Sequence, residues 1–209
     1  MTSHSLALTI AYAASVLGVI TVVPQIVRTF RHPHMGGVAP LSYAISVAAL
    51  VAWITYGFRA GVAPQIPGNV LLLSGSVAIV LLVPSELSRS RRALLLAAAA
   101  LAVVTVSTRL SPEAVGFLAF GIGLFSAWPQ VFATLRGTRE DAGVSLTTFS
   151  LRSAAAVGWL SYAVLARDVP VVLSAVIMLG TTVLVLVVEA SRRAAPVPVL
   201  DDVAVLEPA

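Results

Sequence analysis

The chain has 209 residues, of which 58% are apolar and 11% are charged, and its mean hydropathy is +0.98. Soluble domains carry about a quarter charged residues and about half apolar ones, so this composition excludes a soluble enzyme, a disordered chain and a nucleic-acid-binding module. The 13 basic residues are all arginine and outnumber the 9 acidic ones, and the sequence has no cysteine. Disulfides, thiolate metal sites and a cysteine nucleophile are therefore excluded as well.

Seven apolar runs follow one another along the chain, and each predicts a membrane-spanning helix. Such a helix needs about 20 apolar residues to cross about 30 Å of hydrocarbon. The runs are continuous rather than alternating, which argues against the strands of a barrel. The sequence therefore predicts an all-α integral membrane protein with seven transmembrane helices. The predicted spans are residues 6–27, 41–58, 66–83, 93–108, 114–135, 144–166 and 169–188.

The two ends of the chain flank these spans without adding to them. Residues 1–5 contain no lysine or arginine and six further spans follow the first, so we interpret the first run as a retained helix and not as a signal peptide. Residues 194–209 are interrupted by proline and acidic residues and have no apolar period. We expect a short disordered tail there.

The arginines between the spans predict the orientation of the protein. Alternate connections carry nine of them, and the remaining connections carry three. We expect the protein to lie in the plasma membrane. Because cytoplasmic loops are enriched in basic residues, the N-terminus is predicted to lie outside the cell and the C-terminus in the cytoplasm. The cytoplasmic set is Arg28, Arg31, Arg89, Arg91, Arg92, Arg136, Arg139, Arg192 and Arg193, and the outer set is Arg59, Arg109 and Arg167.

An internal duplication covers three helices in each half of the chain. Six features recur in the same order at an offset of 105 or 106 residues. The pairs are Pro24-Gln25 with Pro129-Gln130, Gly37-Val38 with Gly143-Val144, Trp53 with Trp159, Tyr56 with Tyr162, Asn69 with Ser174, and Gly75 with Gly180. Three crossings leave the chain on the opposite side of the membrane, so a fourth helix must carry it back before the second copy begins.

The duplication predicts a 3+1+3 organisation with two parallel bundles. The first three-helix repeat is expected over residues 1–84 and the linker with the fourth helix over 85–112. The second repeat is expected over 113–190, followed by the cytoplasmic tail at 191–209.

These residues resemble a known family. Pro-Gln at the end of a first helix, followed by Trp and Tyr late in the second, is similar to the PQ-loop superfamily. The 3+1+3 order and the spacing from Trp53 to Asn69 look most like its SWEET sugar-transporter branch, over about residues 5 to 190. The resemblance implies two parallel repeats that move around a shared substrate site. A further Pro64-Gln65 pair on the predicted outer side is interpreted as coincidence.

The duplicated Pro-Gln pairs are predicted hinges. Proline inside a helix removes one backbone hydrogen bond, so Pro24 and Pro129 weaken their helices at matching depths. Gln25 and Gln130 could donate the hydrogen bonds that connect each bend to a neighbouring helix. The alternative is a simple kink near the membrane interface.

By the same resemblance, Trp53, Asn69 and Trp159 are the substrate contacts. An indole stacks on the C–H face of a sugar ring, and an asparagine amide bonds to hydroxyl groups. Ser174 stands where a second Asn is expected, which weakens the amide clamp and puts the usual sugar preference in doubt. The alternative for the two tryptophans is an aromatic belt at the outer interface.

A candidate outer gate follows each tryptophan by one turn. Opposite charges from two bundles could close reversibly over a cavity, since a solvated ion pair contributes only about 0–1 kcal/mol. The alternative is ordinary solvated loop charge. The candidate gate residues are Tyr56, Arg59, Tyr162, Arg167 and Asp168.

Arg152 lies inside the sixth predicted span, at the position that matches Ser46 of the first repeat. One interpretation is a long side chain that reaches back to the cytoplasmic headgroups. The other is a charge that lines an inner vestibule together with Ser46. His32 and His34 lie in the first cytoplasmic loop and are interpreted as solvated residues and not as metal ligands.

The sequence lacks the motifs that would couple transport to a proton gradient or to ATP. No carboxylate lies near the middle of a span, because Glu113 and Glu189 stand at helix ends, and proton-coupled carriers use such a group. No phosphate-binding glycine loop and no catalytic constellation occur. We therefore expect no enzyme activity, no cofactor and no metal.

The function expected from the sequence is passive, alternating-access transport of a small neutral solute, a mono- or disaccharide. The partners expected are this solute and the lipid bilayer, without nucleic acid. A homo-oligomer is left open, although one chain already holds both bundles. Two alternatives are also left open: a PQ-loop carrier of amino acids or other small metabolites, and a non-transporting protein on the same scaffold.

Overall fold

The structure is a computed structural model. It describes residues 3–31, 40–82, 87–136 and 146–194. The side chains described are those of these ranges, apart from residues 3, 22–31, 40–44, 126–136 and 194.

Every regular element in the described ranges is an α-helix, which confirms the predicted fold class. The helices are α1 Ser3–Arg31, α2 Pro40–Ala60, α3 Gln65–Leu82, α4 Arg89–Thr108, α5 Pro112–Arg136, α6 Leu146–Ala166 and α7 Val169–Ala194. Five of them are long and apolar enough in their described parts to cross a membrane. The described apolar parts of α2 and α5, Ile45–Ala60 and Pro112–Phe125, are shorter.

The helices extend past several of the apolar runs that predicted them. Helix α4 begins at Arg89, before its apolar run, because the Ser88 side chain accepts a hydrogen bond of 3.3 Å from the backbone N–H of Arg91. Helix α7 likewise continues through Arg192 and Arg193 in its last turn. Arginines are favourable in the headgroup region, and at the end of α7 they also interact favourably with the helix C-terminus. A length estimate based on hydrocarbon thickness alone therefore omits these turns.

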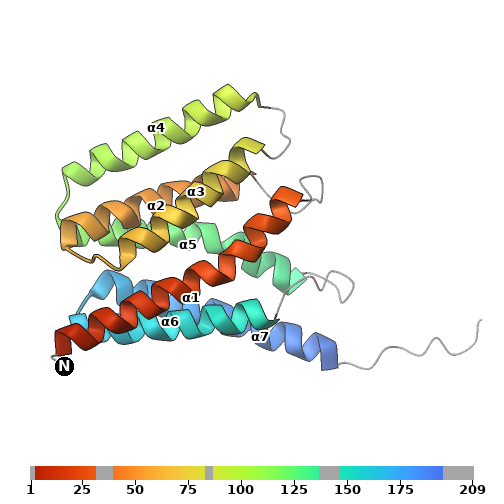
Figure 1. The fold of residues 1–209 in the computed structure, drawn as a ribbon. Coiled ribbons are helices and arrows are strands. Elements are labelled where there is room, and N and C mark those ends of the chain that lie inside the picture. Colours follow the sequence, from red (N-terminus) through yellow and green to blue (C-terminus); the bar gives the residue numbers. More distant parts are fainter. Residues whose placement is uncertain (1–2, 32–39, 83–86, 137–145, 195–209) are drawn as a thin grey trace, which may run out of the picture.

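The helices form two bundles with the same internal order. In the first bundle α3 packs against both α1 and α2, and in the second α7 packs against both α5 and α6. Across the interface α1 packs on α6 and α2 packs on α5. Exchanging the two repeats leaves this pattern unchanged, as expected for parallel bundles related by an axis along the membrane normal. Figure 1 shows the odd-numbered helices running in one direction and the even-numbered helices in the other.

Helix α4 packs against α2 and α3 of the first bundle (Figure 1). Arg59 at the end of α2 holds its C-terminal end by donating hydrogen bonds to the carbonyl oxygens of Ser107 and Leu110. Arg92 at its other end donates to the carbonyl oxygen of Val80 in α3. The linker helix is thus attached to the first repeat at both ends.

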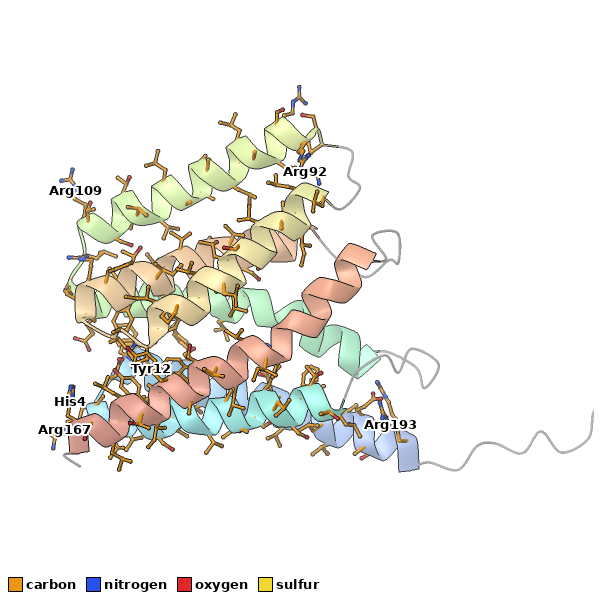
Figure 2. The ribbon with its side chains drawn as sticks, in the orientation of Figure 1. His4, Tyr12, Arg92, Arg109, Arg167 and Arg193 are labelled. Carbon is orange, nitrogen blue, oxygen red and sulfur yellow. The ribbon has the colours of Figure 1, made fainter. Side chains whose placement is uncertain are left out.

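Charged side chains gather at the two ends of the bundle. Figure 2 shows Arg109 and Arg167 at one end, and Arg92 and Arg193 at the other. The apolar surface between these ends includes exposed Leu94, Leu101 and other large side chains. A band of apolar surface between two polar ends is the surface that a multi-pass membrane protein presents to lipid.

The interface between the bundles depends on small residues. A methyl group added at Gly158 of α6 would lie 2.8 Å from the Cβ of Ala14 in α1. The backbones of these helices are therefore as close as glycine allows, as is common where helices pack in membranes.

Replacing this glycine is expected to destabilise the protein. Gly158→Ala should lower the free energy of unfolding by about 1–3 kcal/mol, because the added methyl overpacks the α1–α6 contact. Thermal unfolding in detergent measures the change. Gly180→Ala is the matched control, since no atom lies within 4 Å of its added methyl. Equal melting temperatures for the two variants would contradict the close α1–α6 contact.

Candidate functional site

A cavity of about 200 Å³ lies between the two bundles. Helices α1, α2 and α3 of the first repeat and α6 and α7 of the second contribute to its wall. All four residues predicted to contact substrate, Trp53, Asn69, Trp159 and Ser174, line it. The other described lining residues are Gly18, Thr21, Gln65, Leu72, Arg152, Ala155, Val171, Ala175 and Met178.

The two tryptophans stand in equivalent surroundings in the two repeats. The ring of Trp53 packs edge-on against Tyr56 with a centroid separation of 5.7 Å, and Trp159 packs against Tyr162 at 5.9 Å. In each helix the tyrosine follows the tryptophan by three residues, so both rings lie on the same helix face. Each tyrosine therefore holds an indole edge-on while another part of the indole faces the cavity.

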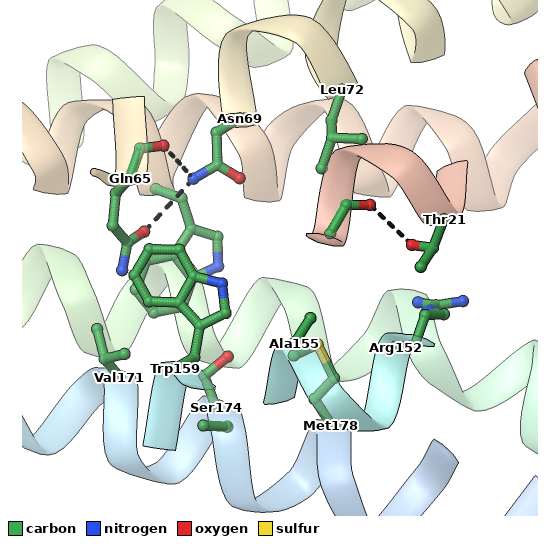
Figure 3. Close-up of a pocket in the computed structure, with 13 residues that line it drawn as sticks. Thr21, Gln65, Asn69, Leu72, Arg152, Ala155, Trp159, Val171, Ser174 and Met178 are labelled. Atoms are coloured by element: carbon green, nitrogen blue, oxygen red, sulfur yellow. Dashed lines mark hydrogen bonds between the residues drawn. The ribbon is translucent and has the colours of Figure 1, made fainter. Parts of the chain in front are cut away.

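The amide of Asn69 is held in one orientation. Its Nδ2 donates to the backbone oxygen of Gln65 at 2.7 Å and approaches the Gln65 Oε1 at 3.4 Å. A backbone carbonyl can only accept a hydrogen bond, so the nitrogen of Asn69 must face Gln65 and its oxygen is left for another donor. Figure 3 shows this amide pair beside the indole of Trp159.

The second repeat has a shorter polar group at the corresponding place. Ser174 of α7 lines the cavity opposite Asn69, with one hydroxyl in place of an amide. The polar wall is therefore uneven: a paired amide cluster on α3 and a single hydroxyl on α7.

Arg152 of α6 lines the same cavity. It precedes Trp159 by seven residues, which places both side chains on one face of α6 about 10 Å apart along the helix axis. Its guanidinium lies 5.6 Å from the centre of the Phe149 ring. Figure 3 shows Arg152 near Thr21, at the opposite end of the cavity from Trp159 and Gln65. Ser46, its counterpart in the first repeat, is half-buried and is not among the described lining residues.

The candidate gate residues separate into two groups in the structure. Tyr56 and Tyr162 are 5% and 6% exposed and belong to one apolar cluster that joins the two bundles. The hydroxyl of Tyr56 donates a hydrogen bond to Asp168, across the interface between the repeats. Arg59 instead holds α4, and Arg167 is exposed at the turn between α6 and α7, with φ of 57°.

Asp168 occupies a partly buried position in this cluster. Its Oδ1 accepts a hydrogen bond of 3.2 Å from the backbone N–H of Val171, which caps the start of α7. Burial raises the pKa of the Asp168 carboxyl, and the negative charge of Glu113 adds to this. The hydrogen bonds from Tyr56 and Val171 act in the opposite direction without cancelling the effect.

The backbone near this cluster is also tightly packed. A methyl group at Gly116 of α5 would lie 2.7 Å from Cβ of Pro170 and 2.9 Å from Cε2 of Tyr56. Tyr56 of the first repeat is thus in close contact with α5 of the second repeat at this cluster.

The predicted hinges are helical in the backbone, since α1 and α5 continue through Pro24 and Pro129. The side chains of these prolines and of Gln25 and Gln130 lie outside the described part of the chain, as do His32 and His34. In the ranges that the structure does describe, no group of three or more His, Cys, Asp or Glu could hold a metal ion.

The two carboxylates predicted at helix ends are placed differently from each other. Glu113 lies in the first turn of α5. Glu189 lies on α7 and is 1% exposed, with its Oε1 at 3.0 Å from both Nε and Nη2 of Arg193. This ion pair compensates the burial of the Glu189 charge. Neither carboxylate is among the described residues of the cavity wall.

Comparisons with known proteins bear on the fold. Residues 6–66 match a family model described as PQ loop repeat. A solved structure of a eukaryotic SWEET transporter is similar over 91% of this chain and 100% of that chain, with a TM-score of 0.72 and 15% sequence identity. The chain is SWEET-like in fold and carries a PQ-loop repeat. No curated protein sequence matches it significantly.

Sequence reasoning missed two polar residues of the cavity wall, Thr21 and Gln65. Gln65 is 5% exposed, lines the cavity and orients Asn69, although Pro64-Gln65 was interpreted as coincidence. The signal was present, because residues four apart on a helix share one face.

Proposed function

We propose that the protein is a facilitative transporter that moves a small hydroxylated solute of the saccharide class by alternating access. The observation that carries this proposal is the cavity between the two repeats, with an indole from each repeat and the Gln65–Asn69 amide pair in its wall. Indole faces pack against the C–H surfaces of a sugar ring, and amides bond to its hydroxyl groups.

The size of the cavity favours a small solute. Pockets for drug-sized ligands measure about 300–1,000 Å³, and this one measures about 200 Å³. A single saccharide ring suits such a volume better than a disaccharide.

Contacts between the two repeats at one end of the cavity support the proposal of an alternating mechanism. The Tyr56–Asp168 hydrogen bond and the close approach of Gly116 to the Tyr56 ring join the two repeats at one end of the described cavity. We propose that this end opens and closes while Pro24 and Pro129 act as hinges near the other end. The gate comprises Tyr56, Tyr162 and Asp168, and Arg59 acts outside it by holding α4.

The proposed organisation keeps the divisions expected from the duplication. The repeats cover residues 1–84 and 113–190, the linker covers 85–112 and a tail follows at 191–209. The N-terminus is placed outside and the C-terminus in the cytoplasm, because the arginines predicted inside are more numerous.

A solute-flux screen in proteoliposomes tests the function. The panel contains a neutral hexose, the corresponding hexuronate, a disaccharide and a neutral amino acid, each measured with and without a pH gradient. We expect saturable counterflow of a monosaccharide-sized solute that a pH gradient does not drive. Absence of flux for every solute would overturn the proposal, and binding of a soluble protein without flux would favour a non-transporting role.

A further inference from the structure

Arg152 is the one charged residue among the described residues of the cavity wall. In the part of the chain that the structure describes, its guanidinium faces no carboxylate, and the contact found for it is the ring of Phe149. A cation–π contact of this kind compensates only part of the cost of removing a guanidinium from water.

The fold itself does not require this charge. Ser46 occupies the equivalent position of the first repeat, where the same helix packs in the same bundle order. Arginine inside a membrane span is costly and usually marks a substrate or ion pathway. A function in the cavity therefore accounts better for Arg152 than a structural one does.

We propose that the transported solute is a monoanion, a monosaccharide-sized sugar acid whose carboxylate is bound by Arg152. The proposal rests on the transport function above and specifies its substrate class. The planar guanidinium donates two parallel hydrogen bonds to a carboxylate. The hydroxylated part of the solute then lies at the other end of the cavity, against Trp159 and the Asn69 amide (Figure 3).

The composition of the wall separates this class from other anions. A zwitterionic amino acid presents an ammonium group, and the described wall residues supply no carboxylate to pair with it. A sugar phosphate carries close to two charges at neutral pH, and the described wall supplies one cation. A single carboxylate matches the single guanidinium.

Transport of such a solute moves charge. Because Arg152 stays with the protein, each passage of a monoanion without a co-transported ion carries one negative charge across the membrane. A potential of about 60 mV should then change the accumulation of the solute about tenfold. A neutral sugar would not respond.

The test uses the full-length protein in proteoliposomes with three matched solutes: glucose, glucuronate and the uncharged methyl ester of glucuronate. Binding is followed by intrinsic tryptophan fluorescence and uptake by radiolabel at imposed potassium diffusion potentials. We expect glucuronate to bind at least about tenfold more tightly than glucose or the ester, since hydrogen bonds between charged groups exceed neutral ones by this much or more. Its uptake should follow the potential.

Variants at position 152 test whether Arg152 causes the preference for glucuronate over glucose. Arg152→Gln should reduce the ratio of glucuronate to glucose affinity to about one, and Arg152→Lys should leave an intermediate ratio, because lysine keeps the charge without the planar fork. Arg109→Gln, which removes an exposed arginine from the end of α4, should leave the ratio unchanged.

The outcomes distinguish this inference from the transport function. Equal binding of the three solutes, or an unchanged ratio in Arg152→Gln, would overturn the assignment of a sugar acid while glucose flux still supported a transporter. Absence of binding and flux for all three solutes would overturn both.

Discussion

Trp53→Ala is expected to weaken solute binding by at least about 30-fold. A buried indole that packs on a ligand contributes about 2 kcal/mol or more, and this amount corresponds to that factor. Trp159→Ala should have a similar effect, because both tryptophans line the cavity and each packs on a tyrosine three residues later. Equilibrium binding to the purified protein and initial uptake rates in proteoliposomes measure the loss.

Two companion variants separate stacking from general damage to α2. Trp53→Phe keeps a flat ring and should recover part of the affinity. Phe58→Ala removes an aromatic side chain from the same helix at a site that is 68% exposed, and it should leave binding unchanged. Full binding by both Trp→Ala variants would contradict the placement of the solute between the two indoles.

The helices and the duplication were predictable because both depend on local sequence. A continuous apolar run of about 20 residues forms a helix in lipid, since within a single segment only a helix satisfies the backbone hydrogen bonds. The offset between Trp53 and Trp159 then predicts equivalent positions in two bundles. Both side chains line one cavity, together with Asn69 and Ser174.

The hydrogen-bond and ion-pair partners of individual polar side chains were not predictable from local sequence. Arg59 was grouped with the gate because it lies close to Tyr56 in the chain, but it bonds to the backbone at Ser107 and Leu110. That contact depends on where the linker helix packs, which no local pattern specifies. The burial of Glu189 also depends on the packing of α7 against its neighbours.

Arg152 shows what the duplication could and could not indicate. Comparing the repeats identifies the substitution of Arg for Ser46, and the seven-residue spacing to Trp159 places both on one helix face. The sequence left two directions open for the long side chain, toward the headgroups or into the interior. In the structure Arg152 lines the cavity.

Opening of the gate is expected to depend on pH through Asp168. In the closed arrangement burial raises the pKa of this carboxyl above its ordinary range, whereas an open gate would expose it to water and restore its usual pKa. A proton therefore binds more tightly to the closed state. Acidic conditions should favour the closed state, and this contribution should be lost as pH rises through the raised pKa.

Labelling of a single cysteine measures the opening. The chain has no native cysteine, so Ser174→Cys places one thiol in the cavity for a membrane-impermeant reagent added on the gate side. Arg109→Cys reports the intrinsic pH dependence of an exposed thiol. The ratio of the two labelling rates should increase as pH rises, and in an Asp168→Asn background this increase should disappear.

Tyr56→Phe is expected to have the larger effect on the gate. Loss of a hydrogen bond to a charged group costs about 1.5–3 kcal/mol, so labelling of the cavity thiol should rise by about 10- to 100-fold at neutral pH. The Tyr56 hydrogen bond also lowers the pKa of Asp168. Removing it should therefore move the remaining pH dependence to higher pH. Unchanged labelling in Tyr56→Phe, or a ratio that falls as pH rises in the parent protein, would contradict a gate closed by Tyr56 and Asp168.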